Sequence, residues 1–327
     1  MDLLRMNDGG YTGEIAALTA AFLWAAATLM FGRIGRRLAP VVLNLVKGGF
    51  ATAFILITLA IQGGATEGSS FPALPITSTV YLLLSGAVGI GLGDTAYFSA
   101  INAIGARRAL LLETLAPPMA AVLAWVFIAE RLSLLAVMGI LLTLLGIAWV
   151  ISERVPGTDK PTWGNGIKVS LLATFCQASG AVLSRAALVD NAVDPLWSSL
   201  LRLVAGLVFM GGLVVLQPQR LGDYQQVTVG RSDRTWQARW QDSLRAMKTP
   251  KVLAAIAVAA FFATYLGIWL QQVALKYTAT GIAQALLATS PLFVLPMAAL
   301  LGDRISWRAT GGAVIALAGV WLLLYVG

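Results

Sequence analysis

Four ionisable side chains lie inside long apolar stretches of this sequence, where a charge requires a partner. Lys47 and Arg202 each follow a proline by seven positions, while Asp94 and Glu113 lie in two other, consecutive stretches. A charge at membrane depth costs about 2.5–3.5 kcal/mol or more, so such residues usually face a cavity or a partner. We expect Lys47 to pair with Asp94 or Glu113 and to close one end of a cavity, and Arg202 to serve the other end.

Each of these charges also has a less specific explanation. The long side chains of Lys47 and Arg202 can snorkel to the membrane surface. The helical rise of about 1.5 Å per residue places Asp94 and Glu113 near the loop between their two stretches, on the side from which Lys47 enters. There the two acids can reach interfacial water or pair with the arginines of residues 107–108.

Amide and aromatic side chains in the same stretches are further candidates for binding a small molecule. An amide in lipid needs a partner, which a wet cavity supplies. Aromatic rings can stack on a flat substrate or bind a cation. The alternatives are helix–helix hydrogen bonds for the amides and packing for the rings. The candidates are Trp24, Tyr97, Gln177, Tyr265, Trp269, Gln271 and Gln284.

Prolines and the remaining acidic residues have structural explanations. Pro117 and Pro291 free backbone carbonyls and can kink their helices, either as hinges or as static bends. Glu14 lies at the first turn of the first stretch, and we expect it at the interface. Two acid–arginine pairs, at residues 130–131 and 303–304, lie in loops at equivalent positions, where we expect them to fix turns between helices.

The missing residue types exclude several kinds of site. The chain has no histidine and one cysteine, Cys176, so histidine or thiolate metal clusters and histidine-based triads are excluded. No phosphate-binding GxxxxGK[ST] motif occurs, which argues against ATP hydrolysis by this chain. We therefore expect no catalytic residues, no metal and no cofactor.

The composition is that of a membrane protein. Of 327 residues, 58% are hydrophobic and 12% are charged, and the mean hydropathy is +0.80. A soluble domain carries about 25% charged residues, so a soluble enzyme, a disordered chain and a nucleic-acid binder are unlikely. The net charge of +8 is explained by Lys and Arg in loops, which set membrane orientation.

Ten stretches are long enough to span a bilayer as helices, because about 20 apolar residues cross about 30 Å of hydrocarbon. They lack the period-two alternation of strands. The acidic N-terminus is not the basic start of a cleaved signal peptide. The predicted helices are 13–32, 40–61, 79–99, 108–128, 133–151, 165–185, 196–217, 252–274, 280–301 and 307–326.

An internal repeat organises these helices. The segment 40–47 aligns with 195–202, Gly93 aligns with Gly267, and Pro117 aligns with Pro291. The two halves, 1–156 and 157–327, hold five helices each. Because five is odd, the second half enters the membrane from the opposite side. The predicted fold is an all-α membrane protein of ten transmembrane helices built from two inverted five-helix repeats, with sites near the midplane between the halves.

A family resemblance follows from the motifs that both halves share. Residues 114–117 (TLAP) and 288–291 (ATSP) are followed by 129–133 (AERLS) and 302–306 (GDRIS), and then by a glycine-spaced helix. Segments carrying these motifs resemble the EamA-type domains of the drug/metabolite transporter superfamily. The resemblance implies a ten-helix permease whose helices 1–4 and 6–9 surround a central cavity, with helices 5 and 10 outside.

The resemblance also implies a function. We expect a secondary transporter that exports amino acids or similar metabolites by alternating access, in which Asp94 or Glu113 could couple a proton. A multidrug or organic-cation exporter is the alternative, but it would want a deep unpaired acid, and none is obvious at mid-membrane. Lys47 and Arg202 suit carboxylate groups. A membrane-embedded lipid-modifying enzyme is a remote alternative, since no nucleophile–base signature supports it.

The loops predict an orientation and a surface helix. Loops on one side hold 17 Lys and Arg residues against 3 on the other, which favours both termini outside an inner cell membrane, although similar proteins are often described with cytoplasmic termini. In the long segment 218–251, Trp236, Trp240, Leu244 and Met247 share one helical face. We expect a basic amphipathic helix on an anionic leaflet, or else an ordinary loop helix.

The expected partners are a small-molecule substrate and the lipid bilayer, with no nucleic acid, and we expect a monomer.

Overall fold

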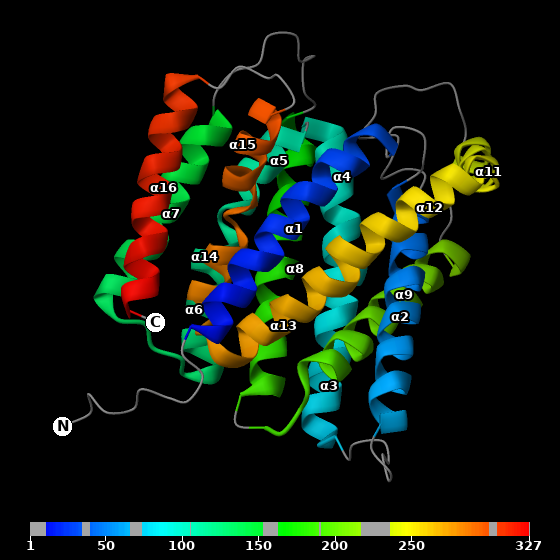
Figure 1. The fold of residues 1–327 in the computed structure, drawn as a ribbon, viewed down its shortest axis with the longest axis horizontal. Coiled ribbons are helices and arrows are strands. Elements are labelled where there is room, and N and C mark those ends of the chain that lie inside the picture. Colours follow the sequence, from blue (N-terminus) through cyan, green and yellow to red (C-terminus); the bar gives the residue numbers. More distant parts are fainter. Residues whose placement is uncertain are drawn as a thin grey trace.

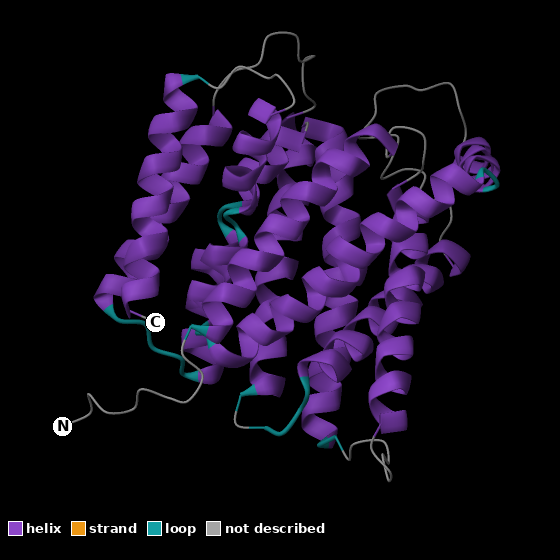
Figure 2. Cartoon of the chain, in the orientation of Figure 1, coloured by secondary structure: helices purple, strands orange, loops and turns teal. Residues whose placement is uncertain are grey.

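The computed structural model describes residues 11–34, 40–65, 74–104, 106–152, 163–189, 191–216, 236–300 and 306–326. Within these ranges every regular element is a helix, as Figure 2 shows. The predicted segments at 218–235 and 303–304 lie outside the described residues. The chain is an all-helical membrane protein of ten transmembrane helices built from two inverted five-helix repeats (Figure 1).

The first repeat contains five spans, of which the third and fourth are composite. The elements are α1 (Thr12–Ile34), α2 (Pro40–Ala65), the third span α3 (Ile76–Ser85), η2 (Gly86–Gly93) and α4 (Asp94–Ile104), the fourth span α5 (Ala106–Glu113) and α6 (Ala116–Ile128), and α7 (Leu134–Ser152).

The second repeat has the same plan, with one additional helix before its third span. Its elements are α8 (Trp163–Leu188), α9 (Pro195–Leu216), the additional α11 (Trp236–Met247), the eighth span α12 (Pro250–Ala259), η3 (Ala260–Leu266) and α13 (Gly267–Tyr277), the ninth span α14 (Thr280–Leu287) and α15 (Ser290–Leu300), and α16 (Trp307–Val326).

All ten predicted helices are present. In the described part of the chain, nine helical stretches are long and apolar enough to cross a membrane, and Thr12–Ala27 is a shorter apolar helix. Large apolar side chains such as Phe127, Leu300 and Trp307 are exposed on the outside of the bundle. This exposure is expected where lipid, rather than water, surrounds a helix.

The two halves pack on each other in reciprocal pairs. The first span contacts the eighth, and the sixth span contacts the third; likewise α2 contacts η3, and α9 contacts η2. In Figure 1, α1 begins at the lower end of the bundle, where α8 ends. The fifth and tenth spans, α7 and α16, lie side by side at one edge of the bundle.

Matching irregularities interrupt the equivalent spans of the two halves. The π-helical segments η2 and η3 occupy equivalent positions in the third and eighth spans. The fourth span breaks at residues 114–115 and the ninth at 288–289, each just before a proline. Pro117 and Pro291 lack an N–H and clash with a preceding turn, so the helix restarts there. The kinks predicted at these two prolines are therefore breaks.

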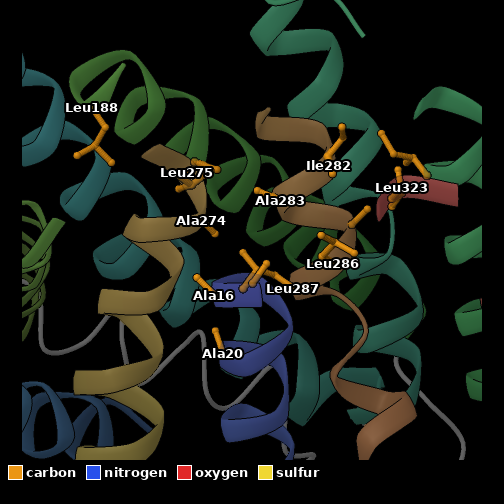
Figure 3. Packing of buried hydrophobic residues seen from close by; sticks show 14 of the residues in the cluster. Ala16, Ala20, Leu188, Ala274, Leu275, Ile282, Ala283, Leu286, Leu287 and Leu323 are labelled. Carbon is orange, nitrogen blue, oxygen red and sulfur yellow. The ribbon is translucent and has the colours of Figure 1, made fainter. Parts of the chain in front are cut away.

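Small side chains bring the helices close together at the lower end of the bundle. Ala16 and Ala20 of α1 pack against Ala274 and Leu275 of α13, and against Leu287 of α14 (Figure 3). Small residues allow close backbone approach in lipid, where dispersion rather than water exclusion drives association. This packing makes the lower end of the bundle a dry region that joins both halves.

Candidate functional site

An ion pair joins the second and third spans. The Lys47 Nζ lies 3.6 Å from Asp94 Oδ2, and each side chain retains about a fifth of its surface exposed, at 19% and 22%. Lys47 lies two turns into α2, and Asp94 begins α4 directly after the π-helical η2. The pairing predicted between Lys47 and an acid of the third or fourth span is therefore present, with Asp94 as the partner.

Both acids lie deeper than the sequence indicated. The third span continues to Ile104 rather than ending at residue 99, so Asp94 is about 15 Å from its end. Glu113 is the last residue of α5, at the break in the middle of the fourth span. Both acids therefore lie further from the ends of their helical spans than the expected helix bounds placed them.

Arg202 lies close to the Lys47–Asp94 pair. Its side chain is buried, with 2% of its surface exposed, and its Nη1 donates to Gln271 Oε1 at 3.3 Å. The guanidinium also interacts electrostatically with Asp94. Glycine at position 86 permits this approach, since a Cβ there would meet the Arg202 backbone. Arg202 therefore interacts with the same acid as Lys47, and the expectation that it serves the opposite end is wrong.

A second acid completes the group. The Tyr97 hydroxyl, one turn after Asp94 on α4, donates a hydrogen bond to the Glu113 carboxylate. Glu113 and Asp94 also interact electrostatically. We name the whole set the charged cluster: Lys47, Asp94, Tyr97, Glu113, Arg202 and Gln271.

The charged cluster offers both signs of charge at membrane depth. Two cations and two carboxylates come from the second, third, fourth and seventh spans, and so from both repeats. The break after Glu113 adds the end of α5 and the start of α6, which carry partial negative and positive charge respectively. Such interrupted helices form substrate sites in inverted-repeat transporters. The arrangement can bind a small molecule that carries an anionic and a cationic group.

Two of the predicted aromatic residues make structural contacts between the repeats. The Trp24 Nε1 donates to the Ala263 carbonyl at 2.8 Å, in the π-helical η3. The Tyr265 hydroxyl shares a 2.8 Å hydrogen bond with Thr58, and its ring packs against Phe54. These polar atoms are already engaged, so the rings are placed to hold the repeats together rather than to bind a ligand through those groups.

The remaining predicted residues surround the charged cluster less directly. Trp269 is half-buried and packs against Tyr265 and its apolar neighbours. Gln177 is half-buried on α8, near Gly93 of η2. Gln284 is buried, and its amide nitrogen has no hydrogen-bond partner within the described residues. Gln284 therefore keeps donor capacity one turn before the break in the ninth span.

A separate polar network closes the lower end of the bundle. Glu130, after α6, pairs with Arg185 at the end of α8, with Nε to Oε1 at 3.0 Å. Its other oxygen accepts from the Thr280 backbone N–H at 2.8 Å. Arg185 also donates to the carbonyls of Leu275 and Lys276 at 2.8 Å. We name this set the far-end network. Residues 130–131 were expected to fix the turn between two helices; Glu130 instead bonds to other spans, and the side chain of Arg131 is exposed.

The first span is tied to the same end. Glu14 is 5% exposed and accepts from the Thr278 hydroxyl at 2.9 Å. Glu14 lies at the first turn of α1, as expected, and the residue that follows α13 covers its side chain. Nearby, Lys276 Nζ donates to the Val193 carbonyl at 2.8 Å.

Sequence reasoning missed several polar residues that the structure brings together. Arg185 was counted as a loop cation, although its position at the end of a span opposite an acid was a usable signal. Gln272 is fully buried and accepts from Ser198 at 2.8 Å. Asn44 is buried one turn before Lys47, a spacing that could have marked it. The side chain of Arg107 and the pair at 303–304 lie outside the described residues.

Comparisons with known proteins identify the family and the fold of the chain. The model of the EamA-like transporter family matches twice, at residues 11–152 and 164–325. No curated protein matches. Twenty-eight chains of solved structures match. One of them, described only as "Crystal structure of protein", is 15% identical, covers 96% of each chain and has a TM-score of 0.70. At that identity the similarity concerns the fold alone.

Proposed function

We propose that the chain, which belongs to the EamA-like transporter family, is a secondary transporter of amino acids or similar zwitterionic metabolites. Because this family consists of membrane transporters of small molecules, the chain has a small-molecule substrate and lies in a lipid bilayer. Export by alternating access is the direction and mechanism that we propose. The charged cluster is the observation that carries the proposal.

The two signs of charge in the cluster favour a zwitterion. A substrate carboxylate would bind beside Arg202, whose guanidinium Nε has no hydrogen-bond partner within the described residues. A substrate ammonium would bind beside Glu113, whose described hydrogen-bond partner is the neutral Tyr97 hydroxyl. A substrate with a single charge would pair with only one of Arg202 and Glu113. The other would face a like charge or have no partner of opposite charge, which costs free energy in a buried site.

The far-end network supports alternating access. It joins the ends of the fourth, sixth, eighth and ninth spans, which belong to both repeats. A rocking motion of one repeat against the other has to break these bonds before that end can open. We therefore assign the Glu130–Arg185 pair as the closed gate of this state, and the partly exposed Lys47–Asp94 pair as the gate of the other end.

Proton coupling would use Glu113. Asp94 has Lys47 as a counter-charge at 3.6 Å, whereas Glu113 accepts from a neutral hydroxyl. Within the described residues Glu113 forms no ion pair, and such a carboxylate can exchange a proton for a substrate ammonium. Pro117 and Pro291 would act as hinges, since the broken helices begin again beside them.

The organic-cation exporter is the second candidate, because Glu113 and Tyr97 could bind a cation alone. A proteoliposome counterflow assay separates the two, with preloaded amino acids in one set of vesicles and quaternary ammonium ions in another. Amino-acid exchange at a rate above protein-free vesicles supports the proposal, and exchange of the quaternary cations alone overturns it. Product analysis of the same vesicles tests the remote lipid-modifying alternative. The Arg308→Gln variant, changed at an exposed position, is the matched control for charge removal.

A further inference from the structure

Helix α11 is the one helix of the second repeat, among those described, that has no counterpart in the first. Figure 1 shows α11 end-on, while α2, α3 and α16 run up the picture. Because the spanning helices define the membrane normal, α11 lies parallel to the plane of the membrane. Helices with this orientation at the bundle end lie in the interfacial layer, between headgroups and acyl chains.

The packing of α11 fixes its depth. Met247, its last residue, packs in one cluster with Leu43 and Phe50 of α2 and with Val252 and Ile256 of α12. Leu43 lies one turn into α2, which is about 5 Å from the end of the span. The C-terminal end of α11 is therefore held at the level where the spanning helices leave the hydrocarbon.

Exposed basic side chains gather at this end of the bundle. Within the described ranges, the exposed Lys and Arg side chains at the α11 end are Lys168, Arg245, Lys248, Lys251 and Arg308, against Arg131 alone at the opposite end. Arg245 lies in the last turn of α11, Lys251 lies in the first turn of α12, and Lys248 lies between the two helices. Each basic residue near an anionic leaflet is worth about 1 kcal/mol, or about fivefold in binding.

We propose that α11 and the start of α12 form a binding surface for anionic phospholipid headgroups, with Arg245, Lys248 and Lys251 as the headgroup ligands. Trp240, half-buried on α11, lies at the headgroup level, as is usual for tryptophan in membranes. Charge complementarity identifies the occupant, since three exposed cations held in the interfacial plane face the phosphates of a leaflet. This surface does not depend on which substrate the charged cluster carries.

Tryptophan quenching by brominated lipids tests this proposal on the full-length protein in vesicles. The difference in emission between the wild type and Trp240→Phe isolates the signal of Trp240 among the ten tryptophans. Vesicles of phosphatidylcholine with brominated phosphatidylglycerol are compared with vesicles in which the phosphatidylcholine is brominated. We expect phosphatidylglycerol to bind beside Trp240 several-fold more tightly than phosphatidylcholine at low salt. The preference should fall at high salt, where the Debye length drops to about 3 Å at 1 M.

Charge variants then identify the ligands. The triple variant Arg245→Gln, Lys248→Gln, Lys251→Gln should lose the preference, whereas the control Lys168→Gln, Arg308→Gln, at the same end but away from α11, should keep it. Equal quenching by both lipids in the wild type, or equal loss in triple variant and control, would overturn the proposal. No quenching of Trp240 by either lipid would also overturn it, since α11 would then face water or a protein partner.

Discussion

At the scale of single residues, Lys47 and Asp94 form an ion pair within the charged cluster. Their charged atoms are 3.6 Å apart, and the two side chains are only about a fifth exposed. Removing one partner takes away part of the compensation for the other charge at membrane depth, which costs more than removing both.

Asp94→Asn should therefore destabilise the protein by about 1–3 kcal/mol, since the pair is only partly buried. The double variant Lys47→Met, Asp94→Leu should recover most of that stability but not transport. Thermal unfolding in detergent and uptake into vesicles measure the two effects. A double variant as unstable as the single one would mean that Asp94 stabilises the protein through buried Arg202 rather than through Lys47.

Glu113 is the residue whose charge should matter for energy coupling. Glu113→Gln keeps an acceptor for the Tyr97 hydroxyl but cannot gain or lose a proton. We expect it to lose counterflow exchange, because the substrate ammonium binds beside this carboxylate, and also to fail to accumulate substrate when a pH gradient is imposed across the vesicle. Asp242→Asn, on α11 and outside the charged cluster, is the control for a general loss of acid. Accumulation by Glu113→Gln at the wild-type level would show that this residue does not couple a proton.

The sequence predicted the partner of Lys47 but misplaced Arg202. The Lys47–Asp94 pair follows from two residues entering from the same membrane side, which helical counting captures. Arg202 was assigned to the other end from its direction of entry alone. Its interaction with Asp94 depends on the close contact of α9 with Gly86, and on the depth that α4 gives to Asp94. Neither is encoded in hydrophobic periodicity.

At the scale of elements, the breaks in the fourth and ninth spans are the parts most suited to movement. Residues 288–289 separate α14 from α15 just before Pro291. Pro291→Ala restores a backbone N–H and should favour a continuous helix there, because alanine is the best helix former.

We therefore expect Pro291→Ala to slow transport several-fold with KM nearly unchanged, while thermal stability stays the same or rises. The control Pro296→Ala removes the proline inside α15, away from the break. Initial rates of uptake against substrate concentration provide kcat and KM. If Pro291→Ala and Pro296→Ala slow transport equally, the break has no special part in the cycle.

Hydrophobic length predicted all ten spans but not their internal structure. Expected and observed ends differ by a few residues, because segments such as 100–104 continue helices beyond the expected stretches. The breaks could be anticipated from Pro117 and Pro291. The π-helical η3 contains neither glycine nor proline, so its residue types did not predict it. Its position, equivalent to that of η2, shows that both repeats contain a π-helical segment.

At the scale of the whole molecule, the far-end network should hold one end closed. Thr280 is fully buried there, and its N–H is bound by Glu130. Glu130→Gln weakens a charge-assisted network that joins both repeats, so opening of this end should become more frequent.

A cysteine at Thr280, placed in a Cys176→Ser background, reports that opening. We expect Glu130→Gln to increase its rate of labelling by a membrane-impermeant thiol reagent several-fold, with the reagent on both sides of the membrane. The control is Arg131→Gln, because Arg131 is the exposed neighbour of Glu130. An unchanged labelling rate in the Glu130 variant would argue that packing alone closes this end.

The inverted repeat explains the fold but not the chemistry of the site. Lys47 and Arg202 occupy equivalent positions, yet the positions equivalent to Asp94 and Glu113 hold Ile268 and Leu287. Both acids of the charged cluster thus come from the first repeat. Alignment of the halves could predict the architecture, the pair of cations and the confinement of the acids to the first repeat, whereas the approach of Arg202 to Asp94 had to come from packing between helices.

The central claim, a carrier selective for zwitterions, is tested most directly by counterflow with three forms of one amino acid. The free amino acid carries both charges, its methyl ester only the cation, and its N-acetyl derivative only the anion. We expect rapid exchange of the free amino acid alone, lost in Arg202→Gln and in Glu113→Gln but kept in Arg308→Gln. Exchange of the methyl ester as fast as the free amino acid would contradict the claim and favour an organic-cation carrier.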